Sequence, residues 1–501
     1  QNFIDEHMQV FEYLVLSIYG IALVLIVLYS IGQLHLIVTF LRRRKKTQAV
    51  PPLEGDENLP FVTIQLPIFN ELYVVERLLD AMADMDYPND RYEIQLLDDS
   101  TDETVAVAAA KIKELQARGI QAHHVRRPER KGFKAGALGY GLDYAKGDYI
   151  AIFDADFVPR PNFLRATLSN FTDDNIGVVQ ARWEHINQDY SLFTEAQAFF
   201  LDAHFTVEQF SRDQGGFFMN FNGTAGVWRK ECIIDAGGWE YDTLTEDLDL
   251  SYRAQMKGWK FKYVDEIGAP AELPAEMGAI KSQQYRWMKG GAEVARKMLT
   301  QIWRSDIPLL HKLHGTMHLL GSSVFVLVLM LGATSVPLLY LKHEVFSGDI
   351  DFLIVPVSLL LISFLILAVF YMLTIMRREP DFITAFKRFL RNYIPYLALS
   401  MGLSLHNTIA VVQGFSGKRT PFIRTPKFNL KNRSDNWKAV KYKSRRIKPS
   451  VYAELIMAIY FCLGVAMCFY FKDFSNMPFL LMQMLGFGAV SLYSFRHAYM
   501  R

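Results

Sequence analysis

Hydrophobic residues divide the chain into apolar runs near its two ends and a block of alternating pattern between them. Residues 11–40 contain no Lys, Arg or Asp and a single Glu, so they form a run long enough to cross a bilayer, which takes about 20 residues. Beyond the alternating block, further apolar runs occur at 313–341, 352–376, 392–414, 452–471 and 477–495. The pattern predicts a membrane protein with a polar block between its membrane segments.

The run 392–414 differs from the others because it contains Asn392, His406 and Gln413. If it crossed the membrane, the basic stretch 418–448 would lie outside, against the positive-inside rule. We therefore predict an amphipathic interfacial helix here and about five spanning helices in total. The basic stretches then all lie in the cytoplasm with the central block, namely 42–46, 377–391, 418–448 and 496–501.

The central block, residues 60–270, alternates strand-like and helix-like runs, which is typical of an α/β domain with a mixed, mostly parallel sheet. Three strand-like runs, at 62–66, 94–97 and 149–153, each end in polar residues. Open α/β sheets bind their ligands at the carboxyl ends of the strands. We therefore expect a ligand site where these three ends meet.

Asp154 and Asp156 directly follow the third of these strand-like runs. Burying two neighbouring carboxylates is costly unless a cation compensates their charge, and oxygen ligands suit Mg²⁺ or Mn²⁺. Such metals commonly take substrate phosphates as further ligands. The pair indicates a metal–diphosphate site, and the alternative is a surface pair that caps a turn, because Asp-x-Asp is a common short motif.

Three further features of the central block suit a nucleotide, and each has a plain alternative. Asp98 and Asp99 could accept hydrogen bonds from a nucleobase or ribose, or could cap the next helix. Phe69 could stack on a base or belong to the core. The stretch 130–138 places basic residues beside small residues at the start of a helix. This stretch could bind phosphate, or it could be a basic turn exposed to solvent. Their combination counts for more than any one of them.

Thr245, Glu246 and Asp247 precede a helix that we predict at 248–257. In one interpretation, Thr245 caps that helix and the two acids interact favourably with the helix dipole. In the other, one of the two carboxylates acts as a general base toward an attacking hydroxyl group. Arg286 and Trp287 would then supply a cation for a diphosphate leaving group and an aromatic wall for a sugar.

The composition indicates no other kind of site. The net charge of +2 argues neither for nor against nucleic acid, and we expect no nucleic acid among the partners. The three cysteines, Cys232, Cys462 and Cys468, form neither a disulfide framework nor a zinc-binding spacing.

Four motifs resemble those of a known family in their order along the chain. They are Asp98-Asp99, Asp154-Ala155-Asp156, Thr245-Glu246-Asp247 and Gln283-Gln284-Tyr285-Arg286-Trp287. This series is similar to the D, DxD, TED and QxxRW motifs of processive family 2 glycosyltransferases, the cellulose, mannan, chitin and hyaluronan synthases. Residues 65–71, 97–102 and 132–138 look most like plant cellulose-synthase-like mannan and glucan synthases. Residues 422–427 resemble the FxVTxK gating loop of cellulose synthases, with Arg424 in place of Val.

The resemblance implies an α/β GT-A glycosyltransferase domain inserted between transmembrane helices, with interfacial helices beside it. The expected divisions are a transmembrane helix and basic flank at 1–46, the cytoplasmic GT-A domain at 47–275, interfacial helices with QxxRW at 276–312, two transmembrane helices at 313–376, interfacial helices and gating loop at 377–450, and two transmembrane helices at 451–501.

The resemblance also implies roles for individual residues. Asp154 and Asp156 would bind Mg²⁺ or Mn²⁺, and Asp247 would be the catalytic base beside Glu246. The nucleotide sugar would contact Phe69, Glu71, Asp98, Asp99, Lys131, Lys134, Asp154 and Arg286. The acceptor would contact Asn222, Thr224, Gln283 and Trp287, and the gating loop would act through Phe422, Thr425 and Lys427.

We therefore expect an inverting, processive hexosyltransferase in an inner or plasma membrane, with its catalytic domain in the cytoplasm. It would polymerise a nucleotide sugar into a β-linked polysaccharide and move that polymer across the bilayer; UDP-glucose is favoured because it serves more of this family.

One alternative is a GDP-mannose-dependent mannan or glucomannan synthase, and another is the transfer of a single sugar to a lipid. A transporter with a nucleotide-binding domain is disfavoured, because spans 352–376 and 477–495 hold no charge before their ends. Accessory subunits are not indicated by the sequence.

Overall fold

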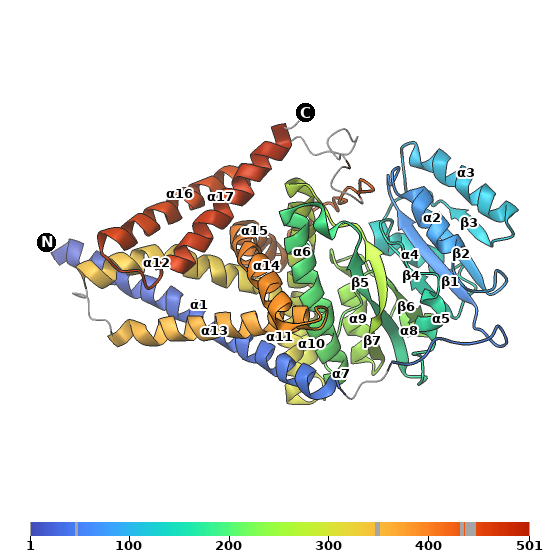
Figure 1. Ribbon diagram of the computed structural model, residues 1–501, viewed down its shortest axis with the longest axis horizontal. Helices are drawn as coiled ribbons and strands as arrows, with labels where there is room; N and C mark the ends of the chain where they lie inside the picture. Colours follow the sequence, from blue (N-terminus) through green and yellow to red (C-terminus); the bar gives the residue numbers. More distant parts are fainter. Residues whose placement is uncertain (1, 46–48, 346–350, 431–434, 436–446, 500–501) are drawn as a thin grey trace.

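The structure is a computed structural model, and it describes residues 2–45, 49–345, 351–430, 435 and 447–499. Figure 1 shows a seven-stranded sheet at one end of the molecule and long helices at the other. Four helices lie between these two parts, namely α6 (Leu192–Ala203), α10 (Met277–Arg304), α14 (Phe382–Gly402) and α15 (Ser404–Phe415). The polar and apolar blocks of the sequence therefore form two layers joined by helices.

The sheet is mixed and mostly parallel, as the sequence predicts. Its strand order is β3-β2-β1-β4-β6-β5-β7, and β6 runs antiparallel to both of its neighbours. Because β1 pairs in parallel with β2 and with β4, the carboxyl ends of these three strands lie at one edge of the sheet. The strands are β1 (Val62–Ile68), β2 (Tyr92–Asp98), β3 (Ala122–Val125), β4 (Tyr149–Ile152), β5 (Ile176–His185), β6 (Gly226–Arg229) and β7 (Lys260–Ala271).

Shorter helices cover the sheet and connect its strands. They are α2 (Val75–Ala83), α3 (Thr104–Ala117), α4 (Phe133–Leu142), α5 (Phe163–Leu168), α7 (Phe210–Gly215), α8 (Lys230–Asp235) and α9 (Glu246–Met256). Helix α11 (Leu309–Leu319) follows the sheet in the chain and packs against α10. A π-helical turn, His204–Gln209, joins α6 to α7, and short 3₁₀ turns occur at Gln188–Tyr190 and Gly321–Ser323.

Among the residues that the structure describes, five helices are long and apolar enough to cross a membrane, which agrees with the predicted number. They are α1 (Asn2–Arg43), α12 (Val324–Glu344), α13 (Asp351–Met376), α16 (Pro449–Tyr470) and α17 (Met477–Tyr499). The predicted run 392–414 is divided between α14 and α15, which meet at a bend of 50° and would make a sixth span if counted together. At that bend Gly402 packs so closely on α17 that a Cβ atom there would lie 2.2 Å from the carbonyl oxygen of Gly486. The interfacial position of this run stays a prediction.

One hydrophobic core spans the border between the sheet and the membrane helices. It contains Ile150 of β4 and Phe199 of α6 together with Phe40 of α1 and Phe370 of α13. Side chains of such a core pack at the density of an organic crystal, so small displacements of one element are felt by its neighbours. The sheet is therefore held directly against α1 and α13.

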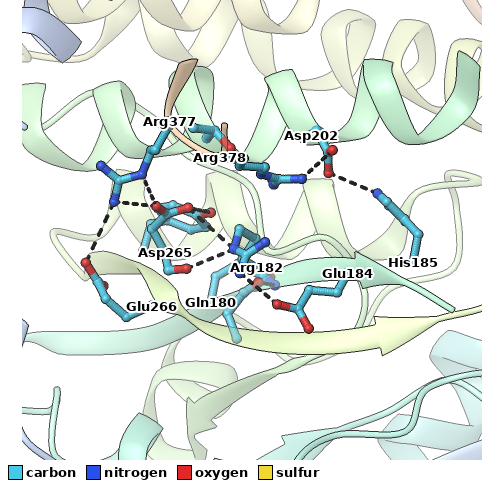
Figure 2. A network of polar contacts seen from close by, with 12 residues as sticks. Gln180, Arg182, Glu184, His185, Asp202, Asp265, Glu266, Arg377 and Arg378 are labelled. Carbon is cyan, nitrogen blue, oxygen red and sulfur yellow. Dashed lines mark hydrogen bonds and ion pairs between the residues drawn. The ribbon is translucent and has the colours of Figure 1, made fainter. Parts of the chain in front are cut away.

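Polar contacts reinforce this border at the end of α13, as Figure 2 shows. Arg378 pairs with Asp202 of α6, which also lies 3.2 Å from His185 Nε2. Arg377 donates to Asp265 of β7 at 2.7 Å. Burial alone would raise the pKa of Asp202, but His185 and Arg378 outweigh it and lower the pKa to about 2. The two arginines, which the sequence shows only as a basic flank, thus join α13 to the sheet layer.

A buried ion pair joins α10 to the last two membrane helices. Lys281 Nζ lies 2.6 Å from Glu454 Oε2 of α16 and 2.9 Å from Ser494 Oγ of α17, and the side chain of Glu454 is fully buried. Lys281→Met would leave the Glu454 carboxylate without its counter-charge, so we expect a loss of about 3–5 kcal/mol in the free energy of unfolding. The midpoint of thermal unfolding of the detergent-solubilised protein measures this loss.

The matched control is Lys111→Met, because Lys111 pairs with the exposed Asp80 and should lose only about 0–1 kcal/mol. The double variant Lys281→Met, Glu454→Leu should recover most of the stability, since it leaves no unpaired charge. Equal loss in the single and double variants would show that packing, and not the ion pair, holds α10 in place.

Candidate active site

Three strand ends meet around one cavity of about 180 Å³. β1 leads into Phe69 and Glu71, β2 into Asp99, and β4 into Asp154 and Asp156. The same cavity is lined by the other site residues that the sequence suggests, namely Lys134, Asn222, Glu246, Asp247, Gln283, Arg286, Trp287, Phe422, Thr425 and Lys427. Segments more than 350 residues apart in the chain therefore meet at one edge of the sheet.

Three residues that the sequence suggests for the site do not line this cavity. The buried Asp98 accepts hydrogen bonds from the Ser100 backbone N–H at 2.8 Å and pairs with His124 Nε2 at 2.8 Å. Thr224 is also buried, and its hydroxyl accepts a hydrogen bond from the backbone N–H of Asp154 at 2.9 Å. Lys131 is exposed. The structure thus places Asp98 and Thr224 behind the cavity lining, where Thr224 holds the backbone of Asp154, and Lys131 on the surface.

Arg127, which the sequence analysis missed, organises the turn that carries Lys134. Its guanidinium donates to both carboxylate oxygens of Asp99, at 2.8 and 2.5 Å, and to the backbone carbonyls of Lys131 and Phe133, at 2.6 and 2.7 Å. Phe133 has φ +49°, a left-handed conformation that is unfavourable for a bulky side chain. Arg127 therefore holds a strained turn in place, and the only sequence signal for it is a pair of basic residues after β3.

Each carboxylate of the acidic pair meets an ammonium group. Lys134 Nζ lies 2.5 Å from Asp154 Oδ1 and 2.8 Å from the carbonyl oxygen of Gly223. Lys427 Nζ lies 2.5 Å from Asp156 Oδ2. The donor set fits a hard divalent cation, because two carboxylates line the cavity and each is paired with an ammonium group that a cation could replace. Asp154 and Asp156 are the residues that would hold such a metal.

A second group of acids is paired with a lysine of the protein. Glu240, Asp242 and Asp249 bring their ligand atoms within 4.8 Å of one another. Lys297 Nζ lies 2.6, 3.0 and 2.9 Å from the three carboxylates. The group is therefore a lysine-centred cluster beside the site.

The segment 422–427 lies across the cavity. Arg286 donates to Thr425 Oγ1 at 2.8 Å and lies over the ring of Phe422, 4.8 Å from its centroid. Arg424, which stands where the cellulose synthases have Val, pairs with Glu71 at 2.6 Å. Burial raises the pKa of Glu71 to about 7, although Arg424 acts in the opposite direction. This segment therefore closes one side of the cavity through contacts with two different walls.

The ring of Phe69 is already covered on one face. The guanidinium carbon of Arg130 lies 3.3 Å from the ring centroid. Arg130 Nε is buried without a hydrogen-bond partner and lies 3.8 Å from Asp99 Oδ2. A base that stacks on this face of Phe69 has to displace Arg130, and the displaced side chain would then have a free donor for the ligand.

Asp247 lies in the first turn of α9 beside Glu246. Burial and the neighbouring Glu246 both raise the pKa of Asp247, although Lys134 acts in the opposite direction. Gly223 passes directly beneath it with φ +79°, and a Cβ atom there would lie 2.8 Å from Asp247 Oδ2. The carboxylate thus sits in a narrow space that only a glycine allows, with a pKa suited to a base near neutral pH.

A second cavity of about 420 Å³ adjoins the first and extends between the membrane helices. Asn222, Asp247 and Trp287 line both cavities. Farther from the sheet, the second cavity is lined by side chains of α1, α12, α13, α14 and α17, among them Ile26, Val328, Leu360, Tyr396 and Phe479. The candidate base therefore lies where a polar cavity meets a path into the membrane region.

Comparisons with known proteins agree with this architecture. Residues 60–290 match the family described as glycosyltransferase like family 2. The probable glucomannan 4-beta-mannosyltransferase 7 of Oryza sativa subsp. japonica is 43% identical over 267 residues, which cover 52% of this chain and 46% of that protein. Glucomannan 4-beta-mannosyltransferase 2 of Arabidopsis thaliana is 41% identical over 280 residues, with 54% and 52% covered. The chain spans about half the length of the curated relatives it matches.

Among solved structures, the mannosyltransferase PcManGT of Pyrobaculum calidifontis, in complex with GDP-Man and Mn²⁺, is similar in fold. The TM-score is 0.53 at 16% identity, and the match covers 80% of this chain and 100% of that one. The sheet and its helices thus have the GT-A fold.

The ion pair between Lys427 and Asp156 predicts competition between an internal amine and a metal. We expect Lys427→Met to tighten Mn²⁺ binding in the absence of nucleotide by about tenfold, because the metal no longer has to break a charged hydrogen bond. Asp156→Asn should abolish the binding. Titration of free Mn²⁺ by electron paramagnetic resonance measures both, and Lys131→Met, which removes an exposed lysine outside the cavity, is the control. Weaker binding by Lys427→Met would show that the amine supports the metal instead of competing with it.

Proposed function

We propose that this chain, a cellulose synthase-like protein whose residues 60–290 belong to the family 2 glycosyltransferases, transfers hexosyl residues from a nucleotide sugar to a growing β-linked polysaccharide. The observation that carries the proposal is the junction at Asp247. There a cavity with an acidic pair and several cations opens into a second cavity between membrane helices. The proposed donor site and the proposed path for a polar product would then lie on the two sides of one candidate base.

The donor that we propose is GDP-mannose. The sequence favours UDP-glucose by the frequency of that donor among similar synthases, but the comparisons do not support this preference. Three curated relatives are named as glucomannan 4-beta-mannosyltransferases, two of them without and one with the word probable, and are 41–43% identical over 267–281 residues. Their names support the mannan or glucomannan alternative.

The residues around the cavity suit a single displacement. Lys134 and Arg286 would stabilise the negative charge that develops on the leaving diphosphate. A divalent metal on Asp154 and Asp156 would add Lewis-acid stabilisation of the same charge when bound. Asp247 would take the proton of the acceptor hydroxyl as its oxygen attacks the anomeric carbon and the bond to the diphosphate breaks. Attack from the face opposite the leaving group inverts the anomer, so an α-linked donor gives a β-linked product.

The second cavity suits an extended sugar chain. Trp287 lies at the junction, and aromatic side chains continue along the cavity at Phe325, Phe364, Tyr371 and Tyr396. Aromatic rings pack against the apolar faces of sugars, while hydroxyl groups of tyrosine offer hydrogen bonds. We therefore propose that the polymer leaves the catalytic cavity past Trp287 and passes between α1, α12 and α13.

The transfer of a single sugar to a lipid is the second candidate. The observation that favours it is the aliphatic part of the second cavity, where Ile26, Val328 and Leu360 would suit an alkyl chain. The two candidates differ in their products, because only processive transfer gives a long polymer. Similarity to named transferases gives no support to the transporter alternative.

A donor screen tests the proposal directly. Purified membranes supplied with Mg²⁺ or Mn²⁺ should release GDP from GDP-mannose and form β-linked product that separates as a ladder or as long polymer on a gel. Much slower release from UDP-glucose is expected. Turnover with UDP-glucose alone would contradict the choice of donor, and one lipid-linked sugar as the sole product would favour the second candidate.

The raised pKa of Asp247 gives a pH prediction with a definite sign. A base works only when it is ionised, so transfer should fall as the pH drops through the pKa of Asp247, which lies above the usual carboxyl value of about 4. Asp247→Asn should reduce transfer by about 100-fold or more and leave nucleotide binding largely intact. Initial rates between pH 5 and 9 measure the first effect, and binding of a fluorescent nucleotide checks the second.

The control is Asp242→Asn, which removes an exposed carboxylate outside the cavity. Asp242→Asn should keep the transfer rate of the wild type and the same fall in rate at low pH. Wild-type turnover by Asp247→Asn would exclude Asp247 as the base.

A further inference from the structure

The π-helical turn His204–Gln209 borders the second cavity and contacts Asn222, which lines both cavities. It interrupts the helical path from α6 to α7, and its residues His204 and Glu208 line the second cavity. A π-helical turn contains an extra residue per turn and is less stable than regular helix, and such turns occur frequently at functional sites. The mechanism proposed above uses none of its residues.

The turn fixes the side chain of Asn222 through two hydrogen bonds. Gln209 Nε2 donates to Asn222 Oδ1 at 2.7 Å, and Gln209 Nε2 also donates to the carbonyl oxygen of Asn220 at 2.8 Å. The amide of Asn222 is therefore oriented with its nitrogen toward His204, whose Nε2 lies 3.0 Å away. His204 Nε2 must accept this hydrogen bond, because the Asn222 nitrogen is a donor only.

The opposite side of His204 is held by a carboxylate. With Nε2 as the acceptor, the ring proton is on Nδ1, and Nδ1 donates to Glu208 Oε2 at 2.9 Å. The other oxygen of Glu208 accepts from Arg212 at 2.8 and 3.0 Å. Burial would raise the pKa of Glu208, but Arg212 and His204 outweigh it and hold the pKa below its usual range. The chain of contacts thus specifies one tautomer of His204 and one orientation of Asn222.

Asn222 belongs to the segment 222–224, which lies against both the acidic pair and Asp247. The next residue, Gly223, accepts from Lys134 at 2.8 Å and passes beneath Asp247, and Thr224 accepts from the backbone N–H of Asp154. Asn222 itself lines both cavities. Its amide has two N–H donors and two acceptor positions, of which the turn uses one each. One donor and one acceptor position are left for a ligand at the junction.

We propose that His204, Glu208 and Gln209 are positioning residues that hold the Asn222 amide ready to bind hydroxyl groups of the acceptor sugar beside Asp247. This inference rests on the proposed transferase function and deepens it, because it names the device that aligns the acceptor. A sugar offers neighbouring hydroxyl groups that both donate and accept, which matches the free donor and acceptor of one amide. Aligning the attacking hydroxyl group in this way contributes to rate through proximity and orientation.

The test compares two substitutions of His204 in the full-length protein. His204→Phe keeps a ring of similar size but removes the acceptor for Asn222, whereas His204→Gln keeps an acceptor at a similar distance from the backbone. Transfer is measured with a mannan oligosaccharide as acceptor, and the slow hydrolysis of GDP-mannose without acceptor is measured in parallel. We expect His204→Phe to raise the KM for the oligosaccharide by about 3- to 10-fold, the effect of one lost hydrogen bond.

The expected pattern separates positioning from general damage to the fold. Hydrolysis of GDP-mannose and its KM should stay within about twofold of the wild type in both variants, because the donor side of the site is unchanged. His204→Gln should restore most of the acceptor affinity. Equal losses in donor hydrolysis and acceptor transfer for both variants would overturn the proposal, since they would indicate a merely structural role.

A second substitution keeps the test decisive if His204→Phe does not fold. Gln209→Met removes the donor to Asn222 Oδ1 and leaves the histidine in place, and it should raise the same KM without affecting hydrolysis. An unchanged KM for the acceptor in Gln209→Met would overturn the proposal. Failure of the wild type to use any nucleotide sugar would instead contradict the proposed function itself, so the two failures are distinguishable.

Discussion

The structure depends on holding several carboxylates close together at the carboxyl edge of one sheet, where most of them have little access to solvent. Asp154, Asp156, Glu71 and Asp247 all line a single cavity, and unpaired charges in such a place would be very costly. Each of the first three is matched by a side chain from a distant segment, namely Lys134, Lys427 and Arg424. The same pairing of opposite charges suits the site to a cation and a diphosphate. A bound cation could take the place of an ammonium group beside the carboxylates, and a bound diphosphate could take the place of a carboxylate beside the cationic side chains.

The membrane helices are part of this arrangement and not only an anchor. The core on one side of the sheet continues into α1 and α13, and Arg377 and Arg378 tie the end of α13 to β7 and α6. Helix α10 carries Arg286 and Trp287 toward the cavity and Lys281 toward α16 and α17. Shared packing therefore fixes the positions of the proposed donor site, the candidate base and the second cavity relative to one another, which a processive enzyme would need at every cycle.

The sequence was most informative where chemistry is encoded locally. Alternation of strand-like and helix-like runs predicted the mixed α/β sheet, and apolar length predicted the five candidate spans. Asp154, Asp156 and Asp247 could be picked out because they stand at a strand end or a helix start within motifs that resemble DxD and TED, and their roles stay proposals. The break of 392–414 at the Gly402–Gly486 contact could not be predicted, because it depends on a partner helix that is 84 positions away in the chain.

The same reason explains the residues that sequence reasoning missed. His204, Arg127 and the pairs of Arg377 and Arg378 act through partners that only the fold brings near. Conversely, Asp98 and Thr224 belong to motifs that point to a ligand, yet their polar atoms are used inside the protein. A sequence motif therefore indicates the part of the chain that forms a site. The hydrogen bonds within the folded protein determine which residues of the motif can face a ligand.

The central claim is that the cavity at Asp247 and the cavity between the membrane helices form one path for a growing polymer. Its most direct test is reconstitution of the purified protein in sealed liposomes, with labelled GDP-mannose and a divalent metal supplied outside. The account predicts a β-linked polymer that becomes resistant to externally added mannanase and sensitive again when detergent opens the vesicles. A product that remains fully accessible to external mannanase throughout synthesis would contradict it.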